Sequence, residues 1–380
     1  MRILFTISPL AAHLAAMLPT IRAASAAGHD VVVGTGPDLA PEVHRRGYQC
    51  WAAGPSARQA WSELTARPAP ADELAQRKHL ACVLYAQPAV ARVREFLRQV
   101  RRWSPDLVIH DLTDAAGAEI AALTGAGQIV HGTGSQTNRQ LAMLRLITAE
   151  FAAELMLPNR FAAILAAPFL DPTPAFLQPE APLLFRAVHP VRPEVDPVRA
   201  GERLPLRTQR FAYERTVLLT LGPSQRPDLL ATALEVISRF EVNLLVETGP
   251  RIEVGMLGPV PMHIAAAQRL APALTLPLCS AVVSHGGTGT VLGAVAHGLP
   301  QVLVPQGDEP RHNAITLNQS GAGHPARGGA AGRLSLRRAL ADVLANPTFA
   351  RTAQSHQAAM AAMPTAADVL RQLTETAVAA

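Results

Sequence analysis

Short apolar runs rich in β-branched residues alternate with longer alanine- and leucine-rich stretches along this chain of 380 residues. In the first half the expected strands are residues 2–7, 30–34, 48–52, 105–111 and 127–132, and a helix is expected at 14–26. Strands that alternate with helices of this length predict a parallel sheet covered on both faces. The sequence therefore predicts a doubly wound α/β fold.

The alternation restarts in the second half, after a proline-rich interruption between residues 160 and 205. The expected strands there are 215–222, 242–249, 280–284 and 301–305, with a helix at about 227–240. Such an interruption is typical of the end of a domain, and the chain is long enough for two cores. We predict two doubly wound parallel-sheet domains that face each other across a cleft.

The predicted boundaries follow from these patterns. We expect an N-terminal domain over residues 1–200 and a linker over residues 201–214. We expect a C-terminal domain over residues 215–358 and a helix over residues 359–380 that packs back on the N-terminal domain.

The charge of the chain resembles that of a nucleic-acid-binding protein, with a net charge of +5 and a pI near 9.7. However, Lys78 is the only lysine, the arginines are scattered among acids, and aromatic residues make up only 4% of the chain. Such a chain lacks both a basic run and a platform for stacking bases. We therefore expect no nucleic-acid partner.

The cysteines and the N-terminus bear on location. Cys50, Cys82 and Cys279 are far apart and lack metal-type spacing, which favours reduced thiols and a cytoplasmic protein. Residues 1–28 imitate a signal peptide, but His13 and Pro19 interrupt the apolar stretch, and residues 2–7 fit a buried strand better. No uncharged apolar run is long enough to cross a bilayer, so we expect no membrane insertion.

The segment "SHGGTGTVLGAVAHGLP" (284–300) places Gly286, Gly287 and Gly289 between an expected strand and an expected helix. Gly298 and Pro300 end that helix. A helix N-terminus at the carboxyl end of a parallel strand favours an anion, and glycine lets a phosphate come close to the backbone. We interpret the segment as a diphosphate site, although a tight turn without a ligand is the structural alternative.

Two common phosphate-binding patterns are missing. The chain has no G-x-x-x-x-G-K-[ST], and no G-x-G-x-x-G follows its first strand. Nucleoside triphosphatase and dehydrogenase functions are therefore disfavoured.

The segment "LCSAVVSHGGTGTVLGAVAHGLPQVLVPQGDEPRHNAITLNQSGAG" resembles the donor-sugar signature of nucleotide-sugar-dependent glycosyltransferases with the GT-B fold. The elements H-G-G-x-G-T, G-x-P-Q, a following acidic residue, "NA" and "GAG" occur in the family's order and spacing. The similarity is greatest to bacterial enzymes that glycosylate antibiotics and other secondary metabolites. It extends to "ILFTISPLAAHLAAMLPTIRAASAAGHDV" at the front and "AAMAAMPTAADVLRQL" near the end.

The resemblance implies that residues 1–200 bind the acceptor and that residues 215–358 bind the nucleotide sugar at a donor site. Its candidate residues are His285, Gly286, Gly287, Thr288, Gly289 and Thr290 at the diphosphate, Gly222 and Ser224 in the loop "TLGPS", Leu270 at the base, and Asp308 and Glu309 at the sugar.

Three departures from the family pattern bear on the donor. Many relatives that use UDP-sugars carry a ribose-binding glutamate where this chain has Gly293, which favours a dTDP-sugar unless another group holds the ribose. Glu309 replaces a glutamine, which suits a deoxy- or aminosugar, although it could equally be a solvated residue at a helix start. Leu270 replaces an aromatic residue, so base stacking at this position is in doubt.

The resemblance also implies a catalytic histidine in the loop that contains His13. Histidine has a pKa suited to deprotonating an acceptor hydroxyl, and a carboxylate commonly orients such a base. Asp111 is the expected partner and Asp114 the second choice. His110 and His131 are expected to face the sheet or line the acceptor pocket.

We therefore expect an inverting glycosyltransferase that moves a sugar from a dTDP-sugar to a hydroxyl of a lipophilic natural product. No metal-type motif appears, so we expect no catalytic metal and no cofactor besides the dTDP-sugar co-substrate. Trp61, Met143 and Phe151 are candidates for an acceptor pocket, or ordinary core residues. A homodimer is possible. The alternatives are a sugar-nucleotide epimerase of the same fold and a non-catalytic protein that binds nucleotide sugars.

Overall fold

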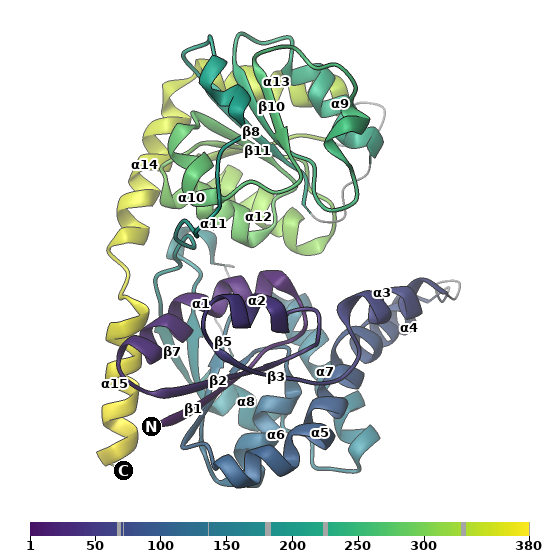
Figure 1. Ribbon diagram of the computed structural model, residues 1–380, viewed down its shortest axis with the longest axis vertical. Helices are drawn as coiled ribbons and strands as arrows, with labels where there is room; N and C mark the ends of the chain where they lie inside the picture. Colours follow the sequence, from purple (N-terminus) through teal and green to yellow (C-terminus); the bar gives the residue numbers. More distant parts are fainter. Residues whose placement is uncertain are drawn as a thin grey trace. The chain divides into compact units, whose positions relative to one another are not determined.

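The chain forms two compact units, each with its own sheet (Figure 1). The computed structural model describes residues 1–66, 70, 72–135, 137–178, 184–222, 227–327 and 332–379. The first unit comprises Met1–Thr173, Pro179–Arg192 and Pro364–Ala380, and the second comprises Pro174–Gln178 and Pro193–Met363.

The first unit is built on a sheet with the strand order β3-β2-β1-β4-β5-β6-β7, in which every described pair is parallel. The strands are β1 (Arg2–Thr6), β2 (Asp30–Thr35), β3 (Gln49–Ala52), β4 (Leu107–Asp111), β5 (Gly127–His131), β6 (Pro168–Asp171) and β7 (Ala187–Pro190). The helices are α1 (Ala11–Ala26), α2 (Ala40–Arg45), α3 (Ala57–Ala66), α4 (Glu73–Ala81), a π-helical turn (Cys82–Ala86), α5 (Gln87–Trp103), α6 (Ala115–Thr124), α7 (Asn138–Leu155), α8 (Phe161–Ala166) and α15 (Ala366–Ala379).

Helices cover both faces of this sheet, as the uninterrupted apolar run of β1 requires. Ile3 and Phe5 pack on one face against α1 and against Val369 of α15. Leu4 points to the other face and packs among residues of α5 and α6, including Phe96. The predicted parallel sheet with two covered faces is therefore present in this unit.

The second unit repeats this plan with the strand order β10-β9-β8-β11-β12-β13, again with parallel pairs. Its strands are β8 (Thr216–Thr220), β9 (Asn243–Glu247), β10 (Ile264–Ala267), β11 (Ala281–Ser284), β12 (Gln301–Leu303) and β13 (Gly323–Pro325). Its α-helices are α9 (Pro227–Ile237), α10 (Pro272–Thr275), α11 (Thr288–Ala296), α12 (Asp308–Gln319), α13 (Gly332–Ala345) and α14 (Pro347–Ala361). The 3-10 helices are Ala175–Leu177, Leu206–Arg210, Val254–Leu257 and Leu276–Leu278.

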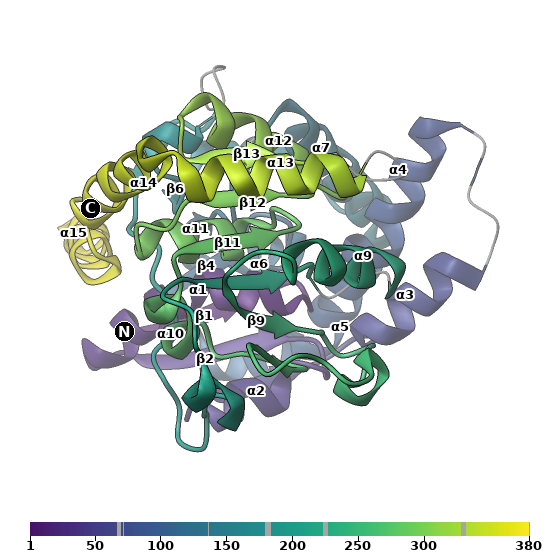
Figure 2. The same ribbon diagram turned by 90° about the horizontal axis from the view of Figure 1, so that it is seen from above.

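The second sheet is also covered on both faces. Helices α9 and α13 pack side by side on the face that carries Val217 and Leu219 (Figure 2). The opposite face carries Leu218 and Leu245, which pack with residues of α11 and with Leu276. The carboxyl ends of β8 and β11 therefore lead into the loops where the donor motifs occur.

We predicted that the proline-rich stretch only connects the two domains, but it also forms part of the first sheet. It contains β6 and β7, which extend the first sheet beyond β5. Prolines are tolerated there because Pro168 begins β6 and Pro190 ends the edge strand β7.

The predicted domain boundaries differ from the observed units. Residues 193–200, predicted in the first domain, and the predicted linker 201–214 group with the second unit. Val195 and Phe211 pack against the core of that unit, and Arg207 donates a hydrogen bond to the carbonyl of Val260 at 3.1 Å. Near its C-terminus the chain passes from the second unit back to the first at Pro364. Helix α14 therefore belongs to the second unit and α15 to the first.

Candidate functional site

The candidate catalytic residues lie where the strand order of the first sheet reverses. Strands β1 and β4 are neighbours, and their connections leave in opposite directions along the sheet. Ligands of open α/β sheets bind outside the carboxyl ends of the strands at such a point. His13 lies in the first turn of α1, just after β1, and Asp111 is the last residue of β4.

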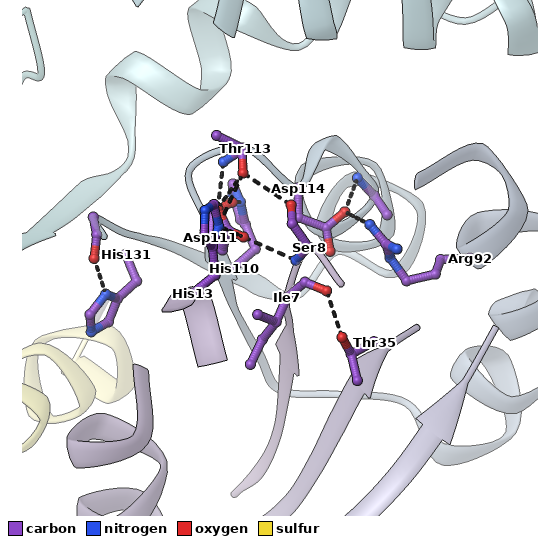
Figure 3. Close-up of polar contacts among 12 residues, drawn as sticks. Ile7, Ser8, His13, Thr35, Arg92, His110, Asp111, Thr113, Asp114 and His131 are labelled. Atoms are coloured by element: carbon purple, nitrogen blue, oxygen red, sulfur yellow. Dashed lines mark hydrogen bonds and ion pairs between the residues drawn. The ribbon is translucent and has the colours of Figure 1, made fainter. Parts of the chain in front are cut away.

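His13 and Asp111 point toward each other at this edge (Figure 3). The Nδ1 of His13 donates to Oδ2 of Asp111 across 2.7 Å. Asp111 is completely buried, whereas the His13 side chain remains 14% exposed. The pair therefore presents an imidazole whose Nδ1 is occupied by a carboxylate, which leaves Nε2 as the nitrogen that can accept a proton.

Other donors hold the Asp111 carboxylate in place. The backbone N–H of Ser8 donates to Oδ2 at 3.0 Å, while the backbone and hydroxyl of Thr113 donate to Oδ1 at 2.6 and 2.8 Å. Burial alone would raise the pKa of Asp111, but the His13 imidazole and the hydrogen bonds from His13 and Thr113 hold it well below its usual range. Asp111 is therefore a carboxylate at any neutral pH.

Asp114, the second choice for the partner acid, has a different environment. It accepts from Nη2 of Arg92 at 2.7 Å, and both side chains are fully buried. Asp114 also accepts from the backbone N–H of Ala116 in the first turn of α6. It therefore fixes the loop that follows Asp111.

His110 and His131 face the interior rather than the edge. His110 contacts the carbonyl of Asp111 at 2.9 Å and Gln128 at 2.9 Å. His131 contacts Thr20 at 2.9 Å, and burial lowers its pKa to about 4. Both rings are thus neutral groups with structural hydrogen bonds.

The candidate donor loop lies at the corresponding point of the second sheet, between β8 and β11. The ring of His285 lies against two glycines, Gly222 after β8 and Gly287 before α11. A Cβ built on Gly222 would lie 2.7 Å from Cε1 of His285, and one built on Gly287 would overlap Nε2. Gly222 and Gly287 therefore make room for the imidazole of His285. This corrects our interpretation that the glycines of the donor loop all clear space for a ligand.

The remaining glycines of the loop serve other purposes. Gly286 has a φ of +85°, a left-handed conformation that favours glycine, and its carbonyl accepts from Nδ2 of Asn313 at 2.9 Å. Gly289 is exposed and faces open space, so it leaves the start of α11 accessible. Burial lowers the pKa of His285, which favours a neutral imidazole beside this helix start.

The side chain of Glu309, from the first turn of α12, contacts the N-terminal turn of α11. Its Oε1 accepts from the backbone N–H of Thr288 at 3.2 Å and from the Thr288 hydroxyl. Asn313 donates to the same hydroxyl oxygen at 3.0 Å. The structure therefore places a side-chain anion where the sequence predicts the diphosphate.

We expect Glu309→Gln to bind dTDP about 3- to 10-fold more tightly than wild type. The substitution removes a negative charge beside an incoming diphosphate and keeps an acceptor for Thr288. Calorimetric titration would measure the change. Asp308→Asn is a matched control, because Asp308 is exposed one residue earlier and lies 3.7 Å from Arg311. Weaker dTDP binding by the Gln variant would contradict this prediction.

Other predicted donor residues differ in their environments. Leu270 is only 3% exposed and packs in the core, so it offers no open surface to a base. Gly293 is buried in α11, where an added Cβ would lie 3.3 Å from Leu276, so packing is a second reason for glycine there. Thr290 is half-buried in the first turn of α11. Ser224 lies outside the described residues.

The predicted acceptor residues are not brought together as one cluster by any described contact. Phe151 is 2% exposed and belongs to the core formed with α5 and α6, and Met143 packs partly buried against that core. Trp61 is 43% exposed on α3, a helix that extends away from the first sheet (Figure 2). For Phe151 the structure supports the core interpretation.

Sequence reasoning missed three residues that build these sites. Ser8 and Thr113 fix the Asp111 carboxylate, and Asn313 ties α12 to the donor loop. Asn313 belongs to the "NA" element of the family signature, which was a usable signal. Backbone contacts such as that of Ser8 leave no trace in residue type.

None of the described helices combines the length and the apolar character needed to cross a membrane. Among the described side chains, no three histidines, cysteines or acids are grouped so that they could hold a metal ion.

Residues 231–376 match the family model described as "Erythromycin biosynthesis protein CIII-like, C-terminal domain". The chain is 29% identical to the elloramycin glycosyltransferase ElmGT of Streptomyces olivaceus, over 98% of this chain and 97% of that protein. It is 25% identical to the aclacinomycin-T 2-deoxy-L-fucose transferase of Streptomyces galilaeus, over 97% and 94%.

Among solved structures, the chain resembles the glycosyltransferase VinC in complex with dTDP. The TM-score is 0.79 at 22% identity, and the match covers all of both chains. This likeness confirms the predicted GT-B architecture of two parallel-sheet α/β domains.

Proposed function

We propose, from the premise that this chain is a glycosyltransferase of the GT-B fold, that it inverts the anomeric centre as it moves a deoxy- or aminosugar from a dTDP-sugar to a hydroxyl group. The acceptor is a lipophilic small molecule of antibiotic or other secondary-metabolite biosynthesis. The observation that carries the proposal is the hydrogen bond between His13 and the buried Asp111 at the carboxyl edge of the first sheet.

In the proposed reaction His13 is the general base. Asp111 holds the Nδ1–H, so Nε2 takes the proton of the acceptor hydroxyl while its oxygen forms a bond to the anomeric carbon. The bond from that carbon to the dTDP oxygen breaks, and the electron pair leaves with dTDP. A single displacement of this kind inverts the anomeric centre, and the Asp111 carboxylate stabilises the imidazolium that forms.

The leaving diphosphate is proposed to bind at the start of α11. The exposed backbone at Gly289 and the neutral His285 ring supply hydrogen-bond donors there, whereas the Thr288 amide donates to Glu309. These groups stabilise the charge that develops on the leaving oxygen, so the proposal includes no catalytic metal and no further cofactor.

The proposed donor nucleotide is dTDP rather than UDP. Gly293 offers no carboxylate to a ribose 2′-hydroxyl, so a UDP-sugar would bury that hydroxyl with fewer partners. We expect dTDP to bind about 5- to 150-fold more tightly than UDP, because UDP would bury a poorly paired 2′-hydroxyl at a cost of about 1–3 kcal/mol. Competition titrations on the wild-type protein measure the ratio, and tighter UDP binding would overturn this donor assignment.

Glu309 supports an aminosugar as one class of donor. Its carboxylate lies at the start of α12, and no described arginine or lysine forms an ion pair with it. A protonated amine on the sugar would supply a charge-assisted partner. Under this proposal Glu309→Gln weakens the binding of an aminosugar donor although it strengthens the binding of dTDP alone.

Replacing His285 by alanine should weaken dTDP binding by about 10-fold, because one hydrogen-bond donor to a charged phosphate is lost. Calorimetry measures the affinity, and circular dichroism checks the fold. His297→Ala is the matched control, since His297 follows the other end of α11 and contacts the carbonyl of Gly293. An unchanged affinity in the His285 variant would exclude the histidine from the phosphate site.

A further inference from the structure

A buried carboxylate at the end of β9 has no part in the proposed mechanism. Glu247 is the last residue of that strand and is largely buried. Burial raises its pKa to about 7, and the hydrogen bond from the backbone N–H of Leu270 and the charge of Arg269 lower the value only in part. An ionisable group kept in such a place usually has a structural or a binding function.

The strand register fixes the position of Glu247 relative to the donor loop. At the carboxyl edge of the second sheet, Ala267, Glu247, Thr220, Ser284 and Leu303 lie in one row on five neighbouring strands. Neighbouring strands are about 4.8 Å apart, which places Glu247 roughly 10 Å along the row from Ser284. His285 follows Ser284 directly.

Glu247 also lies on the face of the sheet that α11 covers. Leu218 and Leu245 precede Thr220 and Glu247 by two residues, and both pack with α11 and Leu276. Because side chains alternate along a strand, Thr220 and Glu247 point to that same face. The carboxylate and the start of α11 are therefore at one edge and on one side of the sheet.

The order of the strands along this edge indicates in which direction a bound donor extends. Glu309 lies in the first turn of α12, which follows β12. Strand β12 lies on the opposite side of β11 from β8 and β9, and the sugar is proposed to bind near Glu309. A diphosphate at α11 then has its sugar toward β12 and its nucleoside toward β8 and β9. We propose that Glu247 is a nucleoside-binding residue, and that its carboxylate accepts a hydrogen bond from the ribose 3′-hydroxyl of the donor.

The chemistry of the carboxylate suits this task. A carboxylate has about four acceptor positions, so it can accept a hydrogen bond from a hydroxyl group as well as the one from the backbone N–H of Leu270. In a thymidine nucleotide the 3′-hydroxyl is the only free hydroxyl of the sugar ring. Glu247 would thus hold the ribose from β9, whereas many UDP-sugar enzymes are expected to hold it from the α11 position that is Gly293 here. This inference rests on the proposed binding of a dTDP donor.

The test compares dTDP with 3′-deoxythymidine 5′-diphosphate by calorimetric titration. Wild-type protein should bind dTDP about 10-fold more tightly, because the analogue lacks the hydroxyl that donates to Glu247. The isosteric variant Glu247→Gln should bind dTDP about 3-fold more weakly than wild type and should lose part of the preference between the two nucleotides, because an amide oxygen is a weaker acceptor than a carboxylate. Glu241→Gln, which changes an exposed acid near the opposite end of β9, should behave like wild type.

Any other outcome contradicts the inference that Glu247 binds the ribose 3′-hydroxyl. Equal wild-type affinities for the two nucleotides would exclude a 3′-hydroxyl contact without recourse to any variant. A Glu247→Gln protein that loses affinity for both nucleotides equally would show that the residue supports the fold of the site rather than the ribose. If wild type binds no thymidine nucleotide, the proposed donor fails as well.

Discussion

Replacing His13 by alanine should lower turnover by about 10²- to 10⁴-fold, the usual contribution of a positioned general base. The variant loses the nitrogen that takes the acceptor proton, while Asp111 keeps its hydrogen bonds from Ser8 and Thr113. Nucleotide affinity should stay within about 2-fold of wild type, because the groups proposed to hold the diphosphate belong to the second unit. Steady-state kinetics and dTDP titration measure the two quantities separately.

A matched control for this experiment is His44→Ala, which removes an exposed histidine from α2 of the same unit. It should leave both turnover and affinity unchanged. Near-normal turnover of the His13 variant with an unactivated hydroxyl acceptor would exclude His13 as the base.

The second large effect concerns stability. Arg92→Met should lower the free energy of unfolding by about 3–5 kcal/mol, because it leaves the Asp114 carboxylate buried without its ion-pair partner. Arg94→Met on the same helix is the control. Arg94 and Glu154 are 60% and 57% exposed at 3.6 Å, so breaking that pair should cost less than about 1 kcal/mol.

Urea denaturation of the two variants and of wild type provides the comparison. Adding Asp114→Asn to Arg92→Met should recover part of the loss, since an amide costs less to bury than a carboxylate. Equal stabilities of the Arg92 and Arg94 variants would mean that the buried pair does not stabilise this unit.

The strands that could be predicted from the sequence are those with a strong local signal. Residues 2–7 and 30–34 are nearly continuous apolar runs, and they form β1 and β2. The missed strands carry weaker signals. β10 is a four-residue segment of isoleucine and alanines, and β13 is Gly323–Pro325. Their partners in the sheet, rather than local propensity, make these segments strands.

The candidate site was predictable in part, for a similar reason. His13 and Asp111 follow strands that the pattern located, so their meeting at one edge followed from the topology. The sequence did not show that Gly222 and Gly287 accommodate the ring of His285, because glycine spacing alone does not say which group comes close. Nor did it show that Glu309 turns toward Thr288, since that contact depends on how α12 packs beside α11.

A single incubation tests whether this protein transfers a sugar to an acceptor and releases dTDP. The protein is mixed with an α-linked dTDP-sugar, with and without a lipophilic hydroxyl acceptor, and the products are followed by mass spectrometry and nuclear magnetic resonance. We expect one β-linked glycoside for each dTDP released, and no change in the nucleotide sugar when the acceptor is absent. Isomerisation of the nucleotide sugar without acceptor, and no glycoside with it, would contradict the account and support an epimerase.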